Sequence, residues 1–254
     1  MSDPVWLADV LRAAGLVVHE YPGAYDRGHG DFGNIWGIVC HHTGSYGETP
    51  RGIAEHPSLG LASQLYLSRD GEFTLCGVGI AWHAGAGSWP GIQRDNANLY
   101  TIGIEAANDG GGKPGKPHRG THDDGSPIWS DAQYNAYVRG VAAILEHLDQ
   151  PTSHVIGHKE WAGAEQGKWD PGAIDMDIFR RDVDTVRAGG TLAGKGDDDV
   201  SWLTEKFENF KKVPGMTYVD WAWWVDKNTS TTLDKVTAME KDIAEIKAAL
   251  KVGK

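Results

Sequence analysis

The sequence predicts an α/β fold over residues 1–190, with a mixed central β-sheet flanked by helices. Two observations support this prediction. Short apolar runs rich in β-branched residues alternate with longer segments whose apolar residues recur at helical spacing. In addition, two of the short runs flank an Asp-Gly turn at residues 70–71, which is typical of a β-hairpin.

The first part of this domain is predicted to contain one helix and four strands. Asp3 and Pro4 suit the cap and the first position of a helix that ends at Gly15. The apolar stripe of this helix consists of Leu7, Val10, Leu11 and Ala14. After a loop at 23–33, the predicted strands are 35–40, which leads into His41, the hairpin strands 63–68 and 72–76, and 100–105, which ends at Glu105.

The second part begins with a long segment, 107–128, that is rich in Gly, Pro, His and Asp and has no periodicity. We expect a loop here, either a mobile element on the substrate side or a tolerated insertion. Ser130 and Gln133 form a capping-box pattern at the start of a helix. The apolar face of that helix comprises Tyr134, Tyr137, Val138, Val141, Leu145 and Leu148. The remaining elements are a strand at 155–157, which leads to His158, and a last helix from Asp175 or Asp177 to Gly189-Gly190.

A change of composition separates this domain from the rest of the chain. Residues 191–200 contain glycines and a run of aspartates and are predicted to be a linker. Residues 201–254 are predicted to form a small helical extension, and its three neighbouring tryptophans at 221–224 would form a small core or stack on sugars. Coiled-coil spacing relates Val236, Met239, Ile243, Ile246 and Leu250. Such a short seam predicts at most weak self-association.

Composition and charge argue against several classes of protein. The net charge of −11 and the lack of long Lys/Arg clusters argue against nucleic acid as a partner. No apolar run approaches the roughly 20 residues needed to cross a bilayer, so we expect no stable membrane insertion. The two cysteines, Cys40 and Cys76, provide no disulfide framework. The first residues lack the pattern of a signal peptide, so we expect the protein to be made and kept in the cytoplasm.

Two histidines and one aspartate are candidates for a metal site. His41 and His158 each follow a predicted strand, and side chains at the ends of different strands can converge at one edge of a sheet. Asp170 supplies a carboxylate. Three N/O ligands leave the fourth position of tetrahedral zinc open, which is the arrangement of a catalytic site. Lys168, two residues before Asp170, is a candidate for stabilising an oxyanion.

Two other histidines compete with these candidates. His42 would point to the opposite face of the strand from His41. His154 lies four residues before His158, as in a helical metal-binding pair. However, residues 155–157 are predicted to form a strand, and the internal glutamate of the His-Glu-x-x-His pattern is absent. We therefore favour His41 and His158 as the ligands.

Five short motifs occur in the order found in a known protein family. They are Cys-His-His-Thr at 40–43, Ala-Trp-His-Ala-Gly at 81–85, Thr-Ile-Gly-Ile-Glu at 101–105, Gly-His at 157–158 and Lys-Trp-Asp-Pro-Gly at 168–172. Through these motifs, residues 30–190 resemble the type 2 family of zinc-dependent N-acetylmuramoyl-L-alanine amidases. A phage lysozyme and the peptidoglycan recognition proteins are related to this family. Each motif alone is weak, whereas the five in order are highly specific.

The resemblance implies a zinc site with a neighbouring cation. His41, His158 and Asp170 match the family's ligands for one zinc ion. Some relatives have a cysteine at the last of these positions, where this chain has Asp170. Lys168 matches the residue that stabilises the oxyanion in this family.

The resemblance also implies a base and substrate contacts. Part of the family uses a glutamate that matches Glu105, and other members use a tyrosine just before the hairpin. This chain has Ala-Ser-Gln-Leu at 62–65, without a tyrosine at the equivalent place, so we favour Glu105 as the base. Trp82 and His83 match a segment that borders the site. We expect them to contact substrate, or His83 to support the ligands, and we do not expect His83 to bind zinc.

The implied activity is hydrolysis of the amide bond between N-acetylmuramic acid and L-alanine in peptidoglycan, with a muramyl peptide as substrate. Domain, linker and extension together resemble an endolysin of a bacteriophage that infects actinobacteria. Such an enzyme waits in the host cytoplasm until a holin opens the membrane, and then acts on the cell wall. A non-catalytic peptidoglycan-recognition module is disfavoured because all three ligand candidates and Lys168 are present. A virion-associated adaptor is compatible with the acidic charge and the coiled-coil seam.

Overall fold

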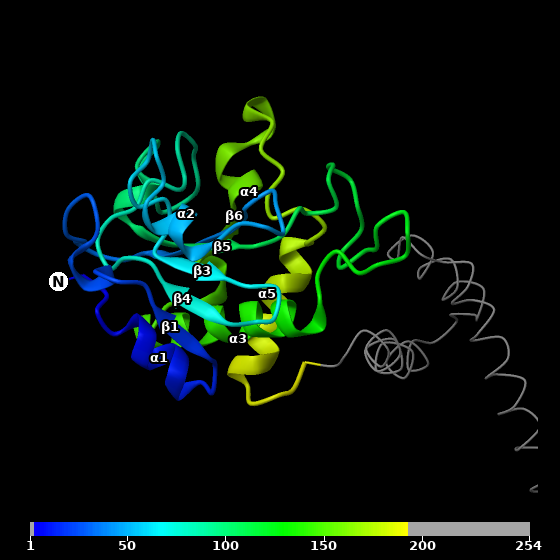
Figure 1. Cartoon of the computed structure of the whole chain (residues 1–254), viewed down its shortest axis with the longest axis horizontal. Coiled ribbons are helices and arrows are strands. Elements are labelled where there is room, and N and C mark those ends of the chain that lie inside the picture. Colours follow the sequence, from blue (N-terminus) through cyan, green and yellow to red (C-terminus); the bar gives the residue numbers. More distant parts are fainter. Residues whose placement is uncertain (1–2, 193–254) are drawn as a thin grey trace, which may run out of the picture. The chain divides into compact units, whose positions relative to one another are not determined.

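The computed structural model describes residues 3–192 of the 254-residue chain. The predicted extension at 201–254, with its coiled-coil seam and its tryptophans, lies outside the described residues. The described part contains a six-stranded sheet with helices packed on it (Figure 1). A mixed sheet flanked by helices is the fold class that the sequence predicts.

The sheet brings several parallel strands to one edge. Its strands are β1 (Val18–Glu20), β2 (Gly37–His42), β3 (Leu65–Leu67), β4 (Phe73–Leu75), β5 (Thr101–Ala106) and β6 (Val155–Gly157). Their spatial order is β1-β4-β3-β5-β2-β6. The β3–β4 hairpin pairs antiparallel, and the other neighbouring pairs are parallel. Strands β5, β2 and β6 therefore run in the same direction, and their carboxyl ends meet at one edge.

Helices pack on both faces of the sheet. They are α1 (Leu7–Ala13), α2 (Pro50–Ala54), α3 (Asp131–Leu148), α4 (His158–Ala162) and α5 (Met176–Arg187), with 3-10 helices at Ala24–Asp26, Ala97–Leu99, Thr152–His154 and Ala164–Gln166. In Figure 1, α1, α3 and α5 lie on one side of the sheet, and α2 and α4 lie on the other. Cys40 of β2 belongs to the core beneath α3 and α5, whereas Val39 belongs to a second cluster with Trp161 of α4. Among the helices of residues 3–192, none combines the length and apolar composition needed to cross a membrane.

The predicted strands are all present, and their ends differ from the predicted ones by at most two residues. The sequence does not predict β1, α2 or α4. The first helix starts later than predicted, at Leu7 and not at Pro4. The Asp3 carboxylate does not cap it, because it accepts a hydrogen bond from the backbone N–H of Phe32 at 2.9 Å. Gly15 follows the helix with a φ of 73°, the left-handed conformation typical of a helix stop.

The two later helices have the predicted caps, with one difference. The hydroxyl of Ser130 accepts from the N–H of Gln133 at 3.1 Å, which caps α3. The Gln133 side chain does not complete a capping box, because it accepts from Asn108 and donates to backbone carbonyls. Asp175 caps α5 by accepting from the N–H groups of residues 177 and 178. Of the two starts left open by the sequence, Asp175 is therefore correct.

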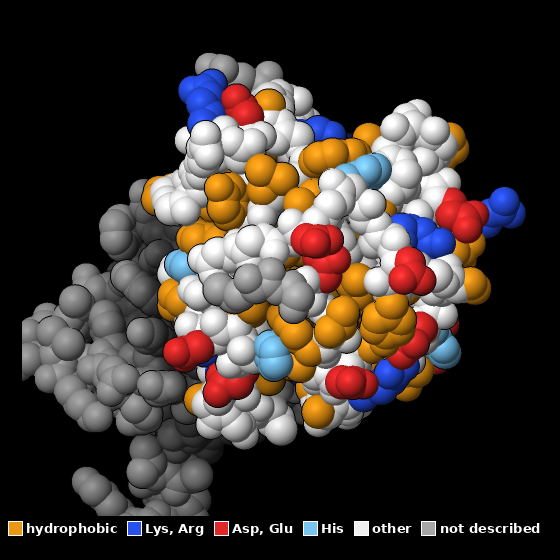
Figure 2. Space-filling model, turned by 90° about the vertical axis from the view of Figure 1, so that its left-hand side faces the viewer, with side chains coloured by type: hydrophobic (Ala, Val, Ile, Leu, Met, Phe, Trp, Pro, Cys, Tyr) orange, Lys and Arg blue, Asp and Glu red, His pale blue; other side chains and the backbone are white. Residues whose placement is uncertain are grey.

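The surface of the described part carries charges of both signs. Figure 2 shows acidic side chains spread over one face, with Lys and Arg beside several of them. Exposed ion pairs include Arg12 with Glu20 at 2.7 Å and Lys116 with Asp123 at 2.8 Å. Such pairs contribute little to stability, because solvent screens them.

The register of the sheet brings predicted site residues together. His41 pairs with Glu105 across β2 and β5, and Cys40 pairs with Gly157 across β2 and β6. His158 follows Gly157 directly, as the first residue of α4. Residues far apart in the sequence thus reach the same edge of the sheet.

Candidate metal and catalytic site

Three donor atoms from three parts of the chain meet at the carboxyl edge of β2 and β6. The Nδ1 atoms of His41 and His158 lie 3.1 Å apart, and Oδ2 of Asp170 lies 3.0 Å from each of them. Asp170 precedes α5, and its carbonyl accepts from the N–H of Lys159 at 2.8 Å, which ties this loop to α4. His41 is 1% exposed and His158 is 6% exposed. The cluster is therefore largely withdrawn from solvent.

This cluster fits a tetrahedral metal ion. Donors that lie 2.0–2.1 Å from zinc in a tetrahedron are about 3.3 Å from one another, close to the separations of 3.0–3.1 Å found here. Nε2 of His158 is 3.0 Å from the carbonyl of Ala84, to which it donates, so its Nδ1 carries the lone pair. Two imidazoles and a carboxylate also match the ligand chemistry of zinc. His41, His158 and Asp170 can therefore hold a metal ion.

Glu105 lies beside the donor atoms, on the neighbouring strand. Its Oε1 is 3.9 Å from Nδ1 of His41, and its side chain is 17% exposed. Its Oε2 is shielded from solvent and has no hydrogen-bond partner among the described residues. Burial, and then the nearby charge of Asp170, raise the pKa of Glu105 well above its usual range. A carboxyl group with a raised pKa is suited to take up and release a proton.

His42 and His154 both lie outside the donor cluster. Nδ1 of His42 accepts from the N–H of Gly172 at 2.9 Å, and its ring meets Trp169 edge-on. Nδ1 of His154 is 2.6 Å from the carbonyl of Trp36, and its ring stacks on that tryptophan at 4.0 Å. Both histidines are thus engaged elsewhere.

The sequence of the described domain matches a family model. Residues 31–173 match the model of N-acetylmuramoyl-L-alanine amidase. The chain belongs to this type 2 amidase family. The match covers more than half of the 254 residues and includes all three donor residues, so it confirms the family that the motifs predict.

Several solved structures are similar to this amidase at low sequence identity. The endolysin amidase LysCS from Clostridium intestinale is 17% identical, with a TM-score of 0.44, over 68% of this chain and 96% of its own. The Ph2119 endolysin from a Thermus scotoductus bacteriophage is 17% identical, with a TM-score of 0.44, over 68% of this chain and 99% of its own. The amidase AmiD from E. coli, in complex with the substrate anhydro-N-acetylmuramic acid-L-Ala-D-gamma-Glu-L-Lys, is 18% identical, with a TM-score of 0.45, over 70% of this chain and 66% of its own. No curated protein matches the sequence.

The other predicted site residues of this amidase lie at different depths around the cluster. Lys168 is exposed, and within residues 3–192 no hydrogen bond or ion pair involves it. Its charge nevertheless reaches the site, where it opposes the larger effect of burial on the pKa of Glu105. Trp82 is 39% exposed. His83 is 8% exposed, and its Nδ1 lies 3.1 Å from Nε2 of His41.

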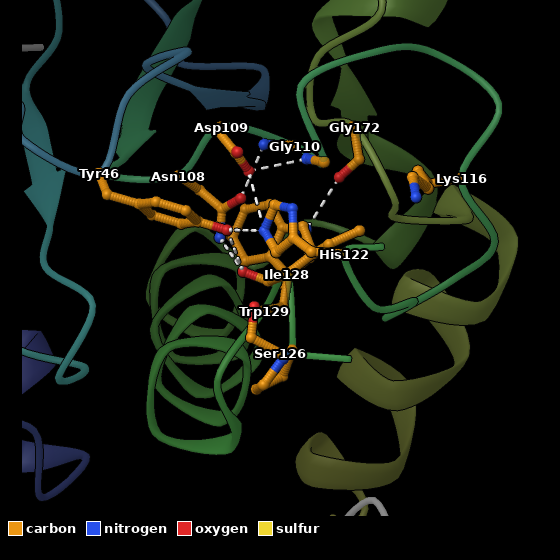
Figure 3. Close-up of polar contacts among 12 residues, drawn as sticks. Tyr46, Asn108, Asp109, Gly110, Lys116, His122, Ser126, Ile128, Trp129 and Gly172 are labelled. Carbon is orange, nitrogen blue, oxygen red and sulfur yellow. Dashed lines mark hydrogen bonds and ion pairs between the residues drawn. The ribbon is translucent and has the colours of Figure 1, made fainter. Parts of the chain in front are cut away.

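A polar network that the sequence does not predict holds the loop at 107–128 (Figure 3). Nε2 of His122 lies 2.6 Å from the hydroxyl of Tyr46 and 3.5 Å from Oδ1 of Asp109. The side-chain amide of Asn108 donates to the carbonyl of Ile128 at 2.8 Å. Tyr46 and His122 are 76 positions apart, so no local motif indicates that they meet.

The end of this loop region also supports the segment that carries a donor residue. Nε1 of Trp129 donates to the carbonyl of Gly172 at 2.8 Å, two residues after Asp170. A Cβ on Gly110 would lie 2.6–2.9 Å from atoms of His42 and Trp169, so the loop packs closely on this segment. The loop of this amidase domain therefore helps to hold the Asp170 segment against the sheet.

Proposed function

We propose that this chain hydrolyses the amide bond between N-acetylmuramic acid and L-alanine in peptidoglycan, with one zinc ion as its cofactor. One observation carries the proposal. The donor atoms of His41, His158 and Asp170 meet within 3.1 Å of one another, beside Glu105, whose buried Oε2 has no hydrogen-bond partner within residues 3–192. Family membership supports the choice of bond and of substrate.

Zinc would be held by Nδ1 of His41, Nδ1 of His158 and Oδ2 of Asp170. When bound, zinc supplies Lewis-acid chemistry and lowers the pKa of water to about 7. The chain contributes ligands in the correct protonation state. Burial lowers the pKa of His41 to about 4, so this imidazole is neutral at pH 7 and its nitrogen is available to a metal.

Glu105 moves the proton in this mechanism. Its carboxylate takes a proton from the water that adds to the amide carbon. The proton then passes to the amide nitrogen of L-alanine as the carbon–nitrogen bond breaks. The products are a carboxylic acid on the muramic acid and a free amine on the peptide. A raised pKa suits Glu105 to both the uptake and the release of this proton.

Lys168 and Trp82 would act on the substrate directly. Lys168 is exposed near the cluster and would place a positive charge beside the oxygen that becomes negative as water adds. Trp82 presents an exposed aromatic surface, on which a sugar ring or the peptide can pack.

We also propose that the enzyme is a phage endolysin that acts on the host cell wall. The support is the organisation expected from the sequence, with the amidase domain at 1–190, a linker at 191–200 and an extension at 201–254. The extension would bind the wall or associate weakly with a second copy. The enzyme would stay in the host cytoplasm until a holin opens the membrane.

Digestion of purified peptidoglycan tests the proposed activity. Products released with and without a chelator are identified by mass spectrometry. We expect stem peptides with a free N-terminal alanine from the wild type, and none after chelation or from His158→Ala. His154→Ala is the matched control, because this histidine bonds Trp36 outside the cluster, and it should give the wild-type products. Cleavage inside the stem peptide or in the glycan would overturn the proposal, and binding of intact muropeptides without cleavage would favour a recognition module or an adaptor.

A further inference from the structure

We infer that His83 is a positioning residue that fixes the tautomer of His41, so that His41 turns an unprotonated Nδ1 toward His158 and Asp170. The inference rests on the proposed zinc site. It assigns His83 to the support of a metal ligand and not to contact with substrate.

The tautomer follows from a chain of hydrogen bonds that starts at a backbone carbonyl. Nε2 of His83 lies 3.2 Å from the carbonyl of Thr101, which can only accept, so this nitrogen carries the proton. A neutral imidazole has a single N–H, so Nδ1 of His83 is an acceptor. Nε2 of His41 lies 3.1 Å from that acceptor and therefore donates to it. The remaining nitrogen of His41, Nδ1, is left with its lone pair.

Several contacts hold His83 in place. The backbone N–H groups of His83 and Ala84 both donate to Oδ1 of Asn98, at 3.0 and 2.8 Å. The ring of His83 lies directly over Gly103 of β5, where a Cβ would be 2.8 Å from Cγ of the imidazole. The ring meets His41 edge-on, at an interplanar angle of 85°. His83 is thus fixed by packing and by hydrogen bonds, and neither of its ring nitrogens is free for substrate.

Ala84, the residue after His83, fixes the tautomer of the second histidine of the cluster, His158. The carbonyl of Ala84 accepts from Nε2 of His158 at 3.0 Å, which leaves Nδ1 of His158 unprotonated. Two consecutive residues therefore orient both imidazoles of the cluster, His83 through its side chain and Ala84 through its backbone. Loss of such an outer hydrogen bond usually weakens metal binding about 10–100-fold.

Two variants separate the hydrogen bond from the packing of the ring. His83→Phe keeps a flat ring but removes the acceptor, whereas His83→Asn keeps an acceptor close to the position of Nδ1. We expect His83→Phe to bind zinc about 10–100-fold more weakly, as measured by competition with a chromogenic chelator, and His83→Asn to recover most of the loss. His154→Phe is the matched control, because it alters a histidine stacked on Trp36, and it should bind zinc like the wild type.

The ring ¹⁵N NMR spectrum of the metal-free wild type is a second measurement, and it needs neither zinc nor activity nor a folded variant. We expect both His41 and His83 to show a protonated Nε2 and an unprotonated Nδ1. A protonated Nδ1 on His41, or unchanged zinc affinity in His83→Phe, would overturn the inference. A wild-type protein that shows this tautomer and binds zinc, but does not cleave peptidoglycan, would support the role of His83 and refute the proposed function.

Discussion

Replacement of Glu105 by glutamine is expected to lower turnover strongly and, at the same time, to stabilise the metal-free protein. Among the described residues, Oε2 of Glu105 has no hydrogen-bond partner and is shielded from solvent, and burial raises the pKa of the Glu105 carboxyl group, so the folded state disfavours its charged form. A buried polar group without a partner lowers stability by about 1–3 kcal/mol, and a charged one by more. The amide of glutamine is uncharged, and it can donate toward Nδ1 of His41, which lies 3.9 Å from Oε1 in the wild type.

The stability that Glu105→Gln gains over the wild type should increase as pH rises. In the unfolded protein the carboxyl group of Glu105 loses its proton near pH 4.5, whereas in the folded protein it keeps the proton to higher pH. Between these two pKa values the folded state binds more protons, so wild-type stability falls as pH rises through this window. Glutamine does not titrate. The variant should therefore be as stable as the wild type below pH 4.5 and more stable at higher pH, by about 1–3 kcal/mol.

Urea unfolding of the chelated proteins across pH measures this difference, and peptidoglycan digestion measures turnover, which should fall about 10²–10⁴-fold without the base. Glu160→Gln is the matched control. Glu160 pairs with Arg180 at 2.8 Å and accepts from the N–H of Gly157 at 2.8 Å, so its loss should destabilise the domain. A Glu105→Gln protein that is less stable than the wild type at pH 7, or that keeps more than a tenth of its turnover, would refute the reasoning.

Three further predictions follow from other parts of the domain. Lys168→Met should lower kcat about 10²–10³-fold while metal analysis shows unchanged zinc, and an unaltered kcat would exclude a role at the oxyanion. Gly37→Ala should destabilise the fold by about 1–3 kcal/mol in urea unfolding, because a Cβ there would overlap the backbone oxygen of His154; equal stability would contradict this packing. Burial lowers the pKa of His118 to about 4 from 6.5, so the unfolded state takes up the proton first and stability falls as pH drops from 6.5 to 4, by at most about 3 kcal/mol. His118→Asn should reduce this dependence of stability on pH, and an unchanged dependence would refute the assignment of the effect to His118.

The strands could be predicted because most of them are buried on both faces. Every position of β2 is buried, so the run of apolar residues is visible without knowledge of the fold. Strand β1 has three residues, of which His19 and Glu20 are exposed, so it shows neither an apolar run nor alternation. Helix α4 has five residues, which is too short for a helical period to appear. The length of an element and the burial of its residues thus decide whether it can be predicted from the sequence.

Local capping patterns fail where a distant partner takes the capping atom. Asp175 has the expected role at the start of α5, where its carboxylate accepts from two nearby N–H groups. The same local rules predict Asp3 and Gln133 as capping residues, but each bonds a group far along the chain, Phe32 and Asn108 respectively. The sequence pattern contains no information about these competing partners.

The candidate site could be predicted in part, because the relevant side chains lie at strand ends. Parallel strands that end together bring the residues at their carboxyl ends to one edge, which is how Glu105, His41 and His158 come to be neighbours. The contact between His83 and His41 follows no such rule. The motif at 81–85 belongs to no helix or strand, so neither period nor register indicates where its side chains point.

Strand pairing and two outer hydrogen bonds bring the donor atoms of the site together. His41 and His158 are 117 positions apart, yet the pairing of β2 with β6 and the bonds to His83 and Ala84 leave their Nδ1 atoms 3.1 Å from each other. The fold therefore fixes the positions of these donor atoms through strand pairing and hydrogen bonds, as a preorganised site requires.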